Sequence, residues 1–160
     1  MLTLFLICVA VFIIAFVLLD RGDKDSERVI YKDTGPKARV FVNKKYKVAA
    51  KPDLILKNID GYIGVEFKSR KYGIYESDIV EAKAAALAAR SKYPIFAIQI
   101  KNQTQNKVIV LPKSNDDLYR EIEGYVSLAS QASSKLLPAN PHPMKCKSCP
   151  VKMSCNERIG

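Results

Sequence analysis

The first 19 residues of the chain lack any ionisable side chain, and no later stretch of that length is uncharged. The absence of a second such run excludes a membrane protein with several spans. All 26 Lys and Arg residues and all 16 Asp and Glu residues follow Leu19 and give a formal net charge of +10. There is no internal repeat. What remains after residue 19 has the size and composition of one basic, soluble domain, which excludes a disordered tail and a multi-domain enzyme.

Residues 1–19 have the length of a single membrane span. As an α-helix they extend about 28 Å, which matches the hydrocarbon thickness of a bilayer. A cleaved signal peptide is the alternative, but no Lys or Arg precedes the apolar run and no Ala-x-Ala site follows it. The sequence therefore predicts an uncleaved transmembrane helix. Basic residues in and just after the charged linker 20–28 predict a single-pass membrane protein whose soluble domain faces the cytoplasm.

Hydrophobic patterning predicts an α/β fold, with a mixed central sheet flanked by helices. Four segments with strand composition precede a helix at 78–90 that is rich in alanine. Two more strands and a helix from Ser114 follow, and Leu118, Ile122, Tyr125, Val126 and Ala129 are predicted to pack this helix against the sheet. The domain is predicted to span 29–137, with a Pro-rich connector and cysteine tail at 138–160. The predicted strands are 39–42, 46–50, 53–56, 62–67, 95–100 and 107–111.

Asp60-Gly61 between two apolar runs predicts a β-hairpin. With a two-residue loop, Asp53 faces Lys68; with a loop at 58–61, Asp53 faces Glu66. Because side chains alternate between the faces of a strand, either register puts Asp53, Glu66 and Lys68 on one face. Gly64 is expected to leave space on that charged side. The opposite face is apolar and is predicted to face the core, through Ile63, Val65 and Phe67.

Two carboxylates and an ammonium group on one sheet face suit phosphodiester hydrolysis. Carboxylate oxygens such as those of Asp53 and Glu66 bind Mg²⁺ or Mn²⁺. Such a metal activates water, and Lys68 can orient that water or stabilise the charge that develops on phosphorus. The alternative is a surface ion pair between Glu66 and Lys68, the usual meaning of an isolated Glu-x-Lys. Pro52-Asp53 before the hairpin, with matching face geometry, favours the catalytic interpretation.

Pro52-Asp53, followed by an apolar strand, a turn and Val65-Glu66-Phe67-Lys68-Ser69, resembles the signature of the PD-(D/E)XK nuclease superfamily. The similarity is greatest to its RecB-like branch, which includes the CRISPR-associated exonucleases, and it extends over residues 29–158. The resemblance implies a restriction-endonuclease-like fold and exonuclease-like cleavage of DNA. It also implies a metal site formed by Asp53, Glu66 and the Phe67 carbonyl, with Lys68 as catalytic base or charge stabiliser.

The helix after the lysine motif departs from the pattern of that branch. The branch usually has a Gln, a Tyr four residues later and often a His three residues earlier, where this chain has Glu81, Ala85 and Asp78. Glu81 is predicted either to face the site as an accessory residue or to form a capping box with Asp78. These departures favour a second hypothesis, a catalytically impaired DNA-binding or scaffold protein that retains the nuclease fold.

Cys146, Cys149 and Cys155 follow a C-x2-C-x5-C spacing in a basic tail. An odd number of thiols in a domain predicted to be cytoplasmic disfavours disulfides, and three thiolates leave one position open on zinc or an iron–sulfur cluster. His142 is a candidate fourth ligand, or an exposed residue of the connector. Cys8 is predicted to face lipid. In the exonucleases that the chain resembles, a similar trio holds an iron–sulfur cluster, which we expect here, with zinc as the alternative.

Basic residues near the predicted site indicate DNA as a partner, because Lys and Arg bind the phosphate backbone. Arg70 and Lys71 are candidate DNA-binding residues just beyond the catalytic strand. Tyr72 and Tyr75 are predicted either to stack on unpaired bases at single-stranded ends or to pack inside the protein. For basic residues next to the membrane segment, attraction to anionic lipid is an equally good explanation.

Overall fold

The computed structural model describes residues 27–35, 38–132, 134 and 141–158. The chain divides into two compact units, of which the first ends at Ile122 and the second begins at Glu123. The predicted transmembrane helix at 1–19 and Cys8 within it lie outside the described residues. Among the residues that are described, no helix is long and apolar enough to cross a membrane.

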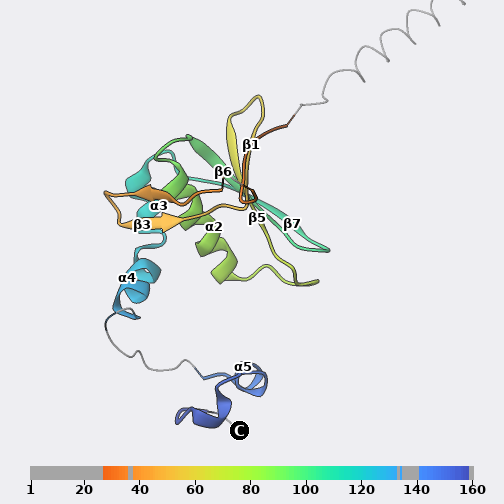
Figure 1. The fold of residues 1–160 in the computed structure, drawn as a ribbon, viewed down its shortest axis with the longest axis vertical. Coiled ribbons are helices and arrows are strands. Elements are labelled where there is room, and N and C mark those ends of the chain that lie inside the picture. The colour runs from red at the N-terminus through yellow and green to blue at the C-terminus, as the bar shows by residue number, and fades with distance from the viewer. Residues whose placement is uncertain (1–26, 36–37, 133, 135–140, 159–160) are drawn as a thin grey trace, which may run out of the picture. The chain divides into compact units, whose positions relative to one another are not determined.

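A five-stranded mixed sheet forms the frame of the first unit (Figure 1). The pair β5 and β6 is parallel, and the other three neighbouring pairs are antiparallel. The prediction of an α/β fold with a mixed central sheet is confirmed. In sheet order the strands are β1 (Arg28–Lys32), β4 (Leu54–Lys57), β5 (Tyr62–Phe67), β6 (Ile95–Lys101) and β7 (Asn106–Val110).

Helix α2 (Glu76–Ala89) makes the crossover that a parallel pair requires between β5 and β6. It lies against the sheet, and a separate hairpin of β2 (Phe41–Asn43) and β3 (Val48–Ala50) packs on the helix (Figure 1). The small side chains of the helix allow this close packing. Its buried alanines are Ala82, Ala85, Ala86, Ala88 and Ala89.

The first strand and the last predicted helix differ most from the sequence prediction. Strand β1 pairs with β4 along the edge of the sheet, although no strand was predicted there. The last predicted helix is two helices, α3 (Asn115–Arg120) and α4 (Glu123–Ala132), with a turn between them. Gly124, a poor helix former, is the second residue of α4. Leu118 and Ile122 are buried as predicted. Helix α4 belongs to the second unit and has no buried residue, Tyr125, Val126 and Ala129 included.

The β4–β5 hairpin adopts the second of the two predicted registers. The pairs run from Leu54 opposite Val65 to Lys57 opposite Tyr62, which leaves a four-residue loop at 58–61. The Asn58 side chain holds this loop, because its Oδ1 accepts hydrogen bonds from the backbone N–H groups of both Asp60 and Gly61, each at 3.0 Å. Extending the register by one residue places Asp53 opposite Glu66.

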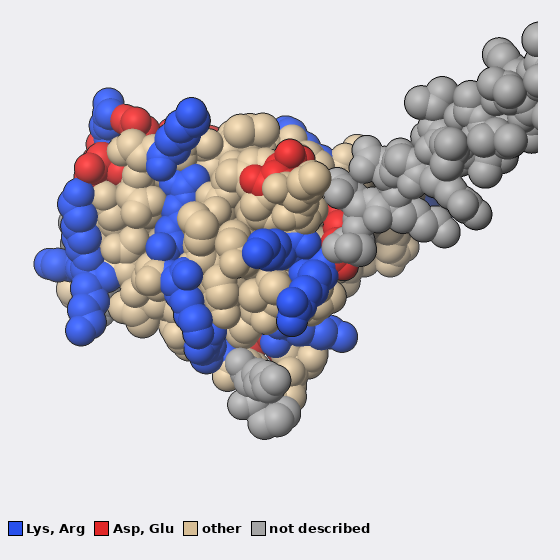
Figure 2. Space-filling model, turned by 90° about the horizontal axis from the view of Figure 1, so that it is seen from above, with Lys and Arg blue, Asp and Glu red and all other residues tan. Residues whose placement is uncertain are grey.

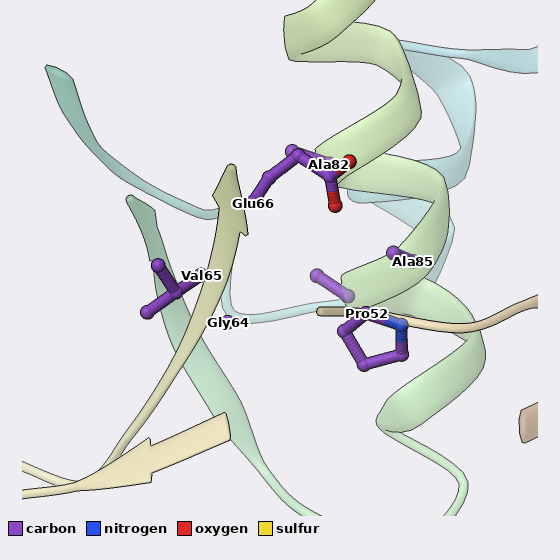
Figure 3. A pocket seen from close by; sticks show the side chains of 7 residues that line it. Pro52, Gly64, Val65, Glu66, Ala82 and Ala85 are labelled. Atoms are coloured by element: carbon purple, nitrogen blue, oxygen red, sulfur yellow. The ribbon is translucent and has the colours of Figure 1, made fainter. Parts of the chain in front are cut away.

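The predicted assignment of the two sheet faces is wrong. Glu66 points toward α2 whereas Val65 points away from it, so the helix covers the face that carries Glu66 (Figure 3). This face contains the buried isoleucines Ile55, Ile98 and Ile100. Gly64 lines the hollow beside Glu66, and a Cβ atom there would lie at an ordinary contact distance of 3.7 Å from the Ile95 side chain.

The opposite face of the sheet is apolar but only partly buried. Val65, on a central strand, is 1% exposed. Phe67, predicted to face the core, is instead 52% exposed, and on the edge strand Val110 is 74% exposed. Burial in this sheet therefore depends on the helix that covers one face and not on the apolar pattern of β5 alone.

Candidate active site

Asp53 lies directly before β4, and Glu66 and Lys68 lie at the end of the neighbouring strand β5. The Oδ2 atom of Asp53 accepts a hydrogen bond from the backbone N–H of Phe67 at 2.7 Å. The Nζ atom of Lys68 lies 2.9 Å from Oε1 of Glu66. The structure therefore brings the three predicted catalytic residues together at one end of the hairpin.

Lys68 is surrounded by carboxylates from two elements. Besides Glu66 on its own strand, Oε2 of Glu81 lies 2.5 Å from its Nζ atom and Oδ1 of Asp78 lies 4.0 Å away. Both of these acids come from the first half of α2. Burial alone would lower the pKa of the Lys68 ammonium, but the hydrogen bonds to Glu81 and Glu66 together outweigh it and raise that pKa. Lys68 therefore carries its charge at neutral pH.

Glu66 is a buried carboxylate of the site, with 7% of the residue exposed. It lines a narrow hollow between β5 and α2 together with Pro52, Ala82 and Ala85 (Figure 3). Burial raises the pKa of Glu66, and the negative charges of Asp53 and Glu81 raise it further, while the hydrogen bond from Lys68 lowers it. A cation beside Asp53 and Glu66 would reduce the repulsion between these carboxylates.

The donor set of the site fits a hard divalent cation. Mg²⁺ binds through one or two carboxylates and completes its octahedral shell with water and substrate oxygens. Asp53 and Glu66 supply such carboxylates, and the Phe67 carbonyl lies between Glu66 and Lys68 in the chain. Within the described ranges, no group of three or more His, Cys, Asp or Glu side chains is arranged to hold a metal ion.

Glu81 and Asp78 have roles that differ from the predicted capping box. Helix α2 begins two residues earlier than predicted, and the Asp78 carboxylate accepts a hydrogen bond from the backbone N–H of the N-cap residue Tyr75 at 2.8 Å. Asp78 therefore belongs to the capping interaction as its third helical residue, and Glu81 does not take part. This leaves Glu81 at the site, in contact with Lys68, which is the first of its two predicted roles.

The predicted DNA-binding residues form an exposed loop between Lys68 and α2. The Nη2 atom of Arg70 forms an ion pair with Asp78, so the loop connects directly to the site. Lys71 is exposed, and Tyr72 and Tyr75 are 65% and 59% exposed. The alternative prediction, that these two tyrosines pack inside the protein, is wrong.

A polar turn that the sequence analysis did not single out supports this loop. Three side chains of the turn after β6 donate hydrogen bonds to backbone carbonyls of the loop. Gln103 Nε2 donates to the carbonyl of Ser69 at 2.8 Å, and Thr104 Oγ1 donates to the carbonyl of Lys71 at 2.5 Å. Asn102 Nδ2 donates to the carbonyl of Gly73 at 3.1 Å. The only sequence signal is the density of amide and hydroxyl side chains at 102–105, which is also common in simple turns.

The cysteine segment belongs to the second unit and is described by itself. Cys146 is buried in the short helix α5 (Pro143–Lys147), whereas Cys149 and Cys155 are partly exposed. None of the three forms a disulfide. A series of backbone hydrogen bonds joins residues 142, 146, 149, 152 and 155, so Cys149 lies one turn after Cys146, and Cys155 lies two turns after Cys149.

His142 is the N-cap residue of α5. Its Nδ1 atom accepts a hydrogen bond from the backbone N–H of Met144 at 3.3 Å. This leaves Nε2 as the nitrogen that is available to a metal. The turn from Lys152 to Ser154 is a short 3₁₀ helix that ends just before Cys155.

The surface of the first unit carries many basic side chains. Figure 2 shows Lys and Arg over much of one face, with fewer Asp and Glu among them. This distribution accords with the net charge of +10. No protein-family model and no curated protein matches the chain, so the site is interpreted from its own geometry.

Proposed function

We propose that this protein is a nuclease that hydrolyses DNA phosphodiester bonds with Mg²⁺ or Mn²⁺. The observation that carries the proposal is the meeting of Asp53, Glu66 and Lys68 at one end of the β4–β5 hairpin, on the face covered by α2. A surface ion pair is the weaker interpretation, because Glu66 is only 7% exposed and burying even a paired carboxylate is weak evidence for a purely stabilising role.

Each residue has one task in this proposal. Asp53 and Glu66, with the Phe67 carbonyl, hold the divalent metal, which supplies activated water and neutralises phosphate charge when bound. Lys68 carries a positive charge beside the scissile phosphate, where it stabilises the negative charge that develops on the oxygens. The hydrogen bond from the Phe67 backbone fixes the orientation of the Asp53 carboxylate. Glu81 holds the Lys68 ammonium in place and is the accessory residue.

The topology supports membership of the PD-(D/E)XK superfamily. In the order of the chain, an antiparallel hairpin carrying the acidic and lysine residues is followed by a helix and by a strand parallel to the second hairpin strand. This is the arrangement that the resemblance at Pro52-Asp53 and Glu66-Phe67-Lys68 implies. A restriction-endonuclease-like fold and exonuclease-like action are therefore part of the proposal.

The remaining parts of the chain complete the proposal. The apolar residues 1–19 anchor the protein in a membrane as a single span, with the soluble domain facing the cytoplasm. Cys146, Cys149 and Cys155 hold an iron–sulfur cluster, with zinc as the alternative, and His142 is the candidate fourth ligand through Nε2. Support comes from the C-x2-C-x5-C spacing of the three cysteines on a short series of linked turns.

A second candidate function is a catalytically impaired DNA-binding or scaffold protein. It is favoured by the contact of Glu81 with Lys68, because an added carboxylate at 2.5 Å offsets the lysine charge that the reaction needs. The same contact repels phosphate. The two candidates differ in whether DNA is cleaved once it is bound.

The deciding experiment is a nuclease assay on the full chain in neutral detergent, with linear DNA and either Mg²⁺ or Mn²⁺. The wild-type protein should cleave DNA, and Lys68→Ala should reduce the rate by about 100-fold or more, the usual effect of losing a group that stabilises transition-state charge. Lys113→Ala is the matched control, because it removes an equal charge from an exposed residue just after β7. Cleavage that survives Lys68→Ala, or none with either metal, contradicts the catalytic assignment.

A further inference from the structure

The loop at residues 69–75 presents two exposed aromatic rings, each next to a cation. The Nζ atom of Lys71 lies 5.1 Å from the centroid of the Tyr72 ring, and Cζ of Arg70 lies 4.7 Å from that of Tyr75. More than half of each tyrosine remains exposed. Two accessible rings with adjacent positive charges are the elements of a surface that binds single-stranded nucleic acid by stacking and backbone attraction.

The loop is held in place before any ligand binds. Hydrogen bonds from three side chains of the turn at 102–105 fix its backbone at Ser69, Lys71 and Gly73, and Arg70 Nε adds a fourth bond to the Gly73 carbonyl at 3.0 Å. Preformed rings lose little conformational entropy on binding.

Gly73 allows the Tyr75 ring to lie over the loop backbone. Gly73 has a φ of +77°, and a Cβ atom there would lie 2.9 Å from Cζ of Tyr75. A larger residue would therefore displace the ring as well as strain the turn. The Tyr75 ring is thus placed by the backbone conformation of Gly73 and by the Arg70 guanidinium, and not by burial in the core.

The loop is physically continuous with the proposed active site. Asp78 accepts the Tyr75 backbone N–H and pairs with Arg70, and its other oxygen lies 4.0 Å from Lys68 Nζ. A strand whose phosphate lies at Lys68 therefore has its neighbouring nucleotides beside Arg70 and Lys71. This is where bases would reach Tyr72 and Tyr75.

We propose that Tyr72 and Tyr75 form a stacking platform for unpaired bases, so that single-stranded DNA is the preferred substrate of the site. The inference rests on the proposed nuclease function and deepens it. Bases within a duplex are already stacked and paired, so a ring on the protein surface gains this contact only from bases that are unpaired. The lysine and arginine contacts, in contrast, are available to either form of DNA.

The test compares binding of two strands that differ only in their bases. Fluorescence anisotropy of the full chain in neutral detergent, without added divalent metal, gives the affinity for an oligothymidylate of about 12 nucleotides and for an abasic strand of equal length. The wild type should bind the oligothymidylate about tenfold more tightly. Tyr72→Ala and Tyr75→Ala should each reduce this ratio, whereas Tyr72→Phe, which keeps the ring, should preserve it.

Lys71→Gln is the matched control for charge, because it should weaken binding of both strands by the same factor and lower the salt dependence. Equal binding of the two strands by the wild type, or an unchanged ratio in Tyr72→Ala and Tyr75→Ala, overturns the platform and leaves the exposed rings to a protein partner. Base-dependent binding without any cleavage in the nuclease assay keeps the platform and refutes the catalytic proposal. Cleavage without base-dependent binding refutes the platform and keeps the catalytic proposal.

Discussion

Asp78 Oδ1 lies 4.0 Å from Lys68 Nζ, while the same carboxylate accepts the Tyr75 backbone N–H and pairs with Arg70. One buried acid thus connects the start of α2, the loop at residues 69–75 and Lys68. Asp78 stands where the RecB-like branch often has a His, and in this chain its contacts are structural ones. This position, at which the sequence departs from the pattern of the branch that it resembles, therefore has a structural role.

Asp78→Asn should destabilise the fold in a pH-dependent manner. Burial raises the pKa of Asp78, but the Arg70 guanidinium and the Tyr75 backbone N–H together lower it below the ordinary value of 3.8. Stabilisation by the ionised carboxylate is then fully present above pH 3.8 and is lost as the pH falls through the lower pKa of the folded state. At neutral pH the variant should lose about 1–2 kcal/mol of unfolding free energy.

Urea unfolding of the full chain in detergent, followed by circular dichroism across the acid range, measures this effect. The difference in unfolding free energy between wild type and Asp78→Asn should shrink as the pH decreases below 3.8. A difference that stays constant or grows on acidification would show that Asp78 does not stabilise the fold as a carboxylate.

Glu81→Gln should strengthen DNA binding. The Glu81 side chain is 59% exposed and its carboxylate repels phosphate beside Lys68, so its neutralisation should increase affinity about two- to fivefold, less at high salt. Glu121→Gln is the control, because it removes the same charge from a partly exposed residue that pairs with Lys83. Anisotropy titrations at two salt concentrations measure both variants. An equal increase in DNA affinity in the two variants would mean that the change in net charge alone is responsible.

Arg90→Met should destabilise the fold without changing the chemistry of the site. Arg90 follows α2 and donates to the carbonyls of Ile95 and Pro112, each at 2.8 Å, and to Asn115 Oδ1 at 3.2 Å. Its loss leaves three acceptors without this donor and should cost about 2–3 kcal/mol of unfolding free energy. Arg90→Lys should lose part of this unfolding free energy, because an ammonium group cannot reproduce the planar set of N–H donors of the guanidinium.

Chemical denaturation measures the loss in both Arg90 variants, and Arg120→Met serves as the control. The Arg120 side chain is 71% exposed, so its removal should change the unfolding free energy by less than about 0.5 kcal/mol. An Arg90→Met variant as stable as this control would refute the role of Arg90 in joining α2 to β6 and α3.

The sequence correctly predicted that Asp53, Glu66 and Lys68 lie close together. Side chains alternate between the faces of a strand with a fixed period, so the prediction holds for either loop length. The register itself was ambiguous, because it depends on the hydrogen bonds that the Asn58 side chain makes to the loop backbone. A local pattern therefore determines which residues share a face, but not which residues are exactly opposite.

The covered face could not be predicted from the apolar pattern of β5. Phe67 and Val65 alternate with Glu66 and Lys68 as core residues do, yet α2 lies on the other side, where its buried alanines pack against the sheet. Likewise, the exposure of Tyr72 depends on hydrogen bonds from a turn that is some 30 residues distant in sequence. Such long-range contacts leave no local signal.

The cysteine segment yields the last prediction, that Cys146→Ser, Cys149→Ser and Cys155→Ser each remove the metal centre. The full chain, purified without oxygen, should be coloured and contain iron and sulfide, because three thiolates so close together in the sequence suit one cluster. Zinc without colour would support the alternative ligation. Visible absorption and metal analysis distinguish these outcomes, and a colourless protein without metal would refute both.

Two further variants define the ligand set. Cys8→Ser should leave the metal content unchanged, because residue 8 belongs to the proposed membrane span and cannot share a cytoplasmic site. His142→Asn retains an oxygen that can cap α5 in place of Nδ1, so the helix should persist while Nε2 is lost. Loss of metal in this variant, with the circular dichroism spectrum unchanged, would identify His142 as the fourth ligand. Retention of metal would assign His142 to capping alone.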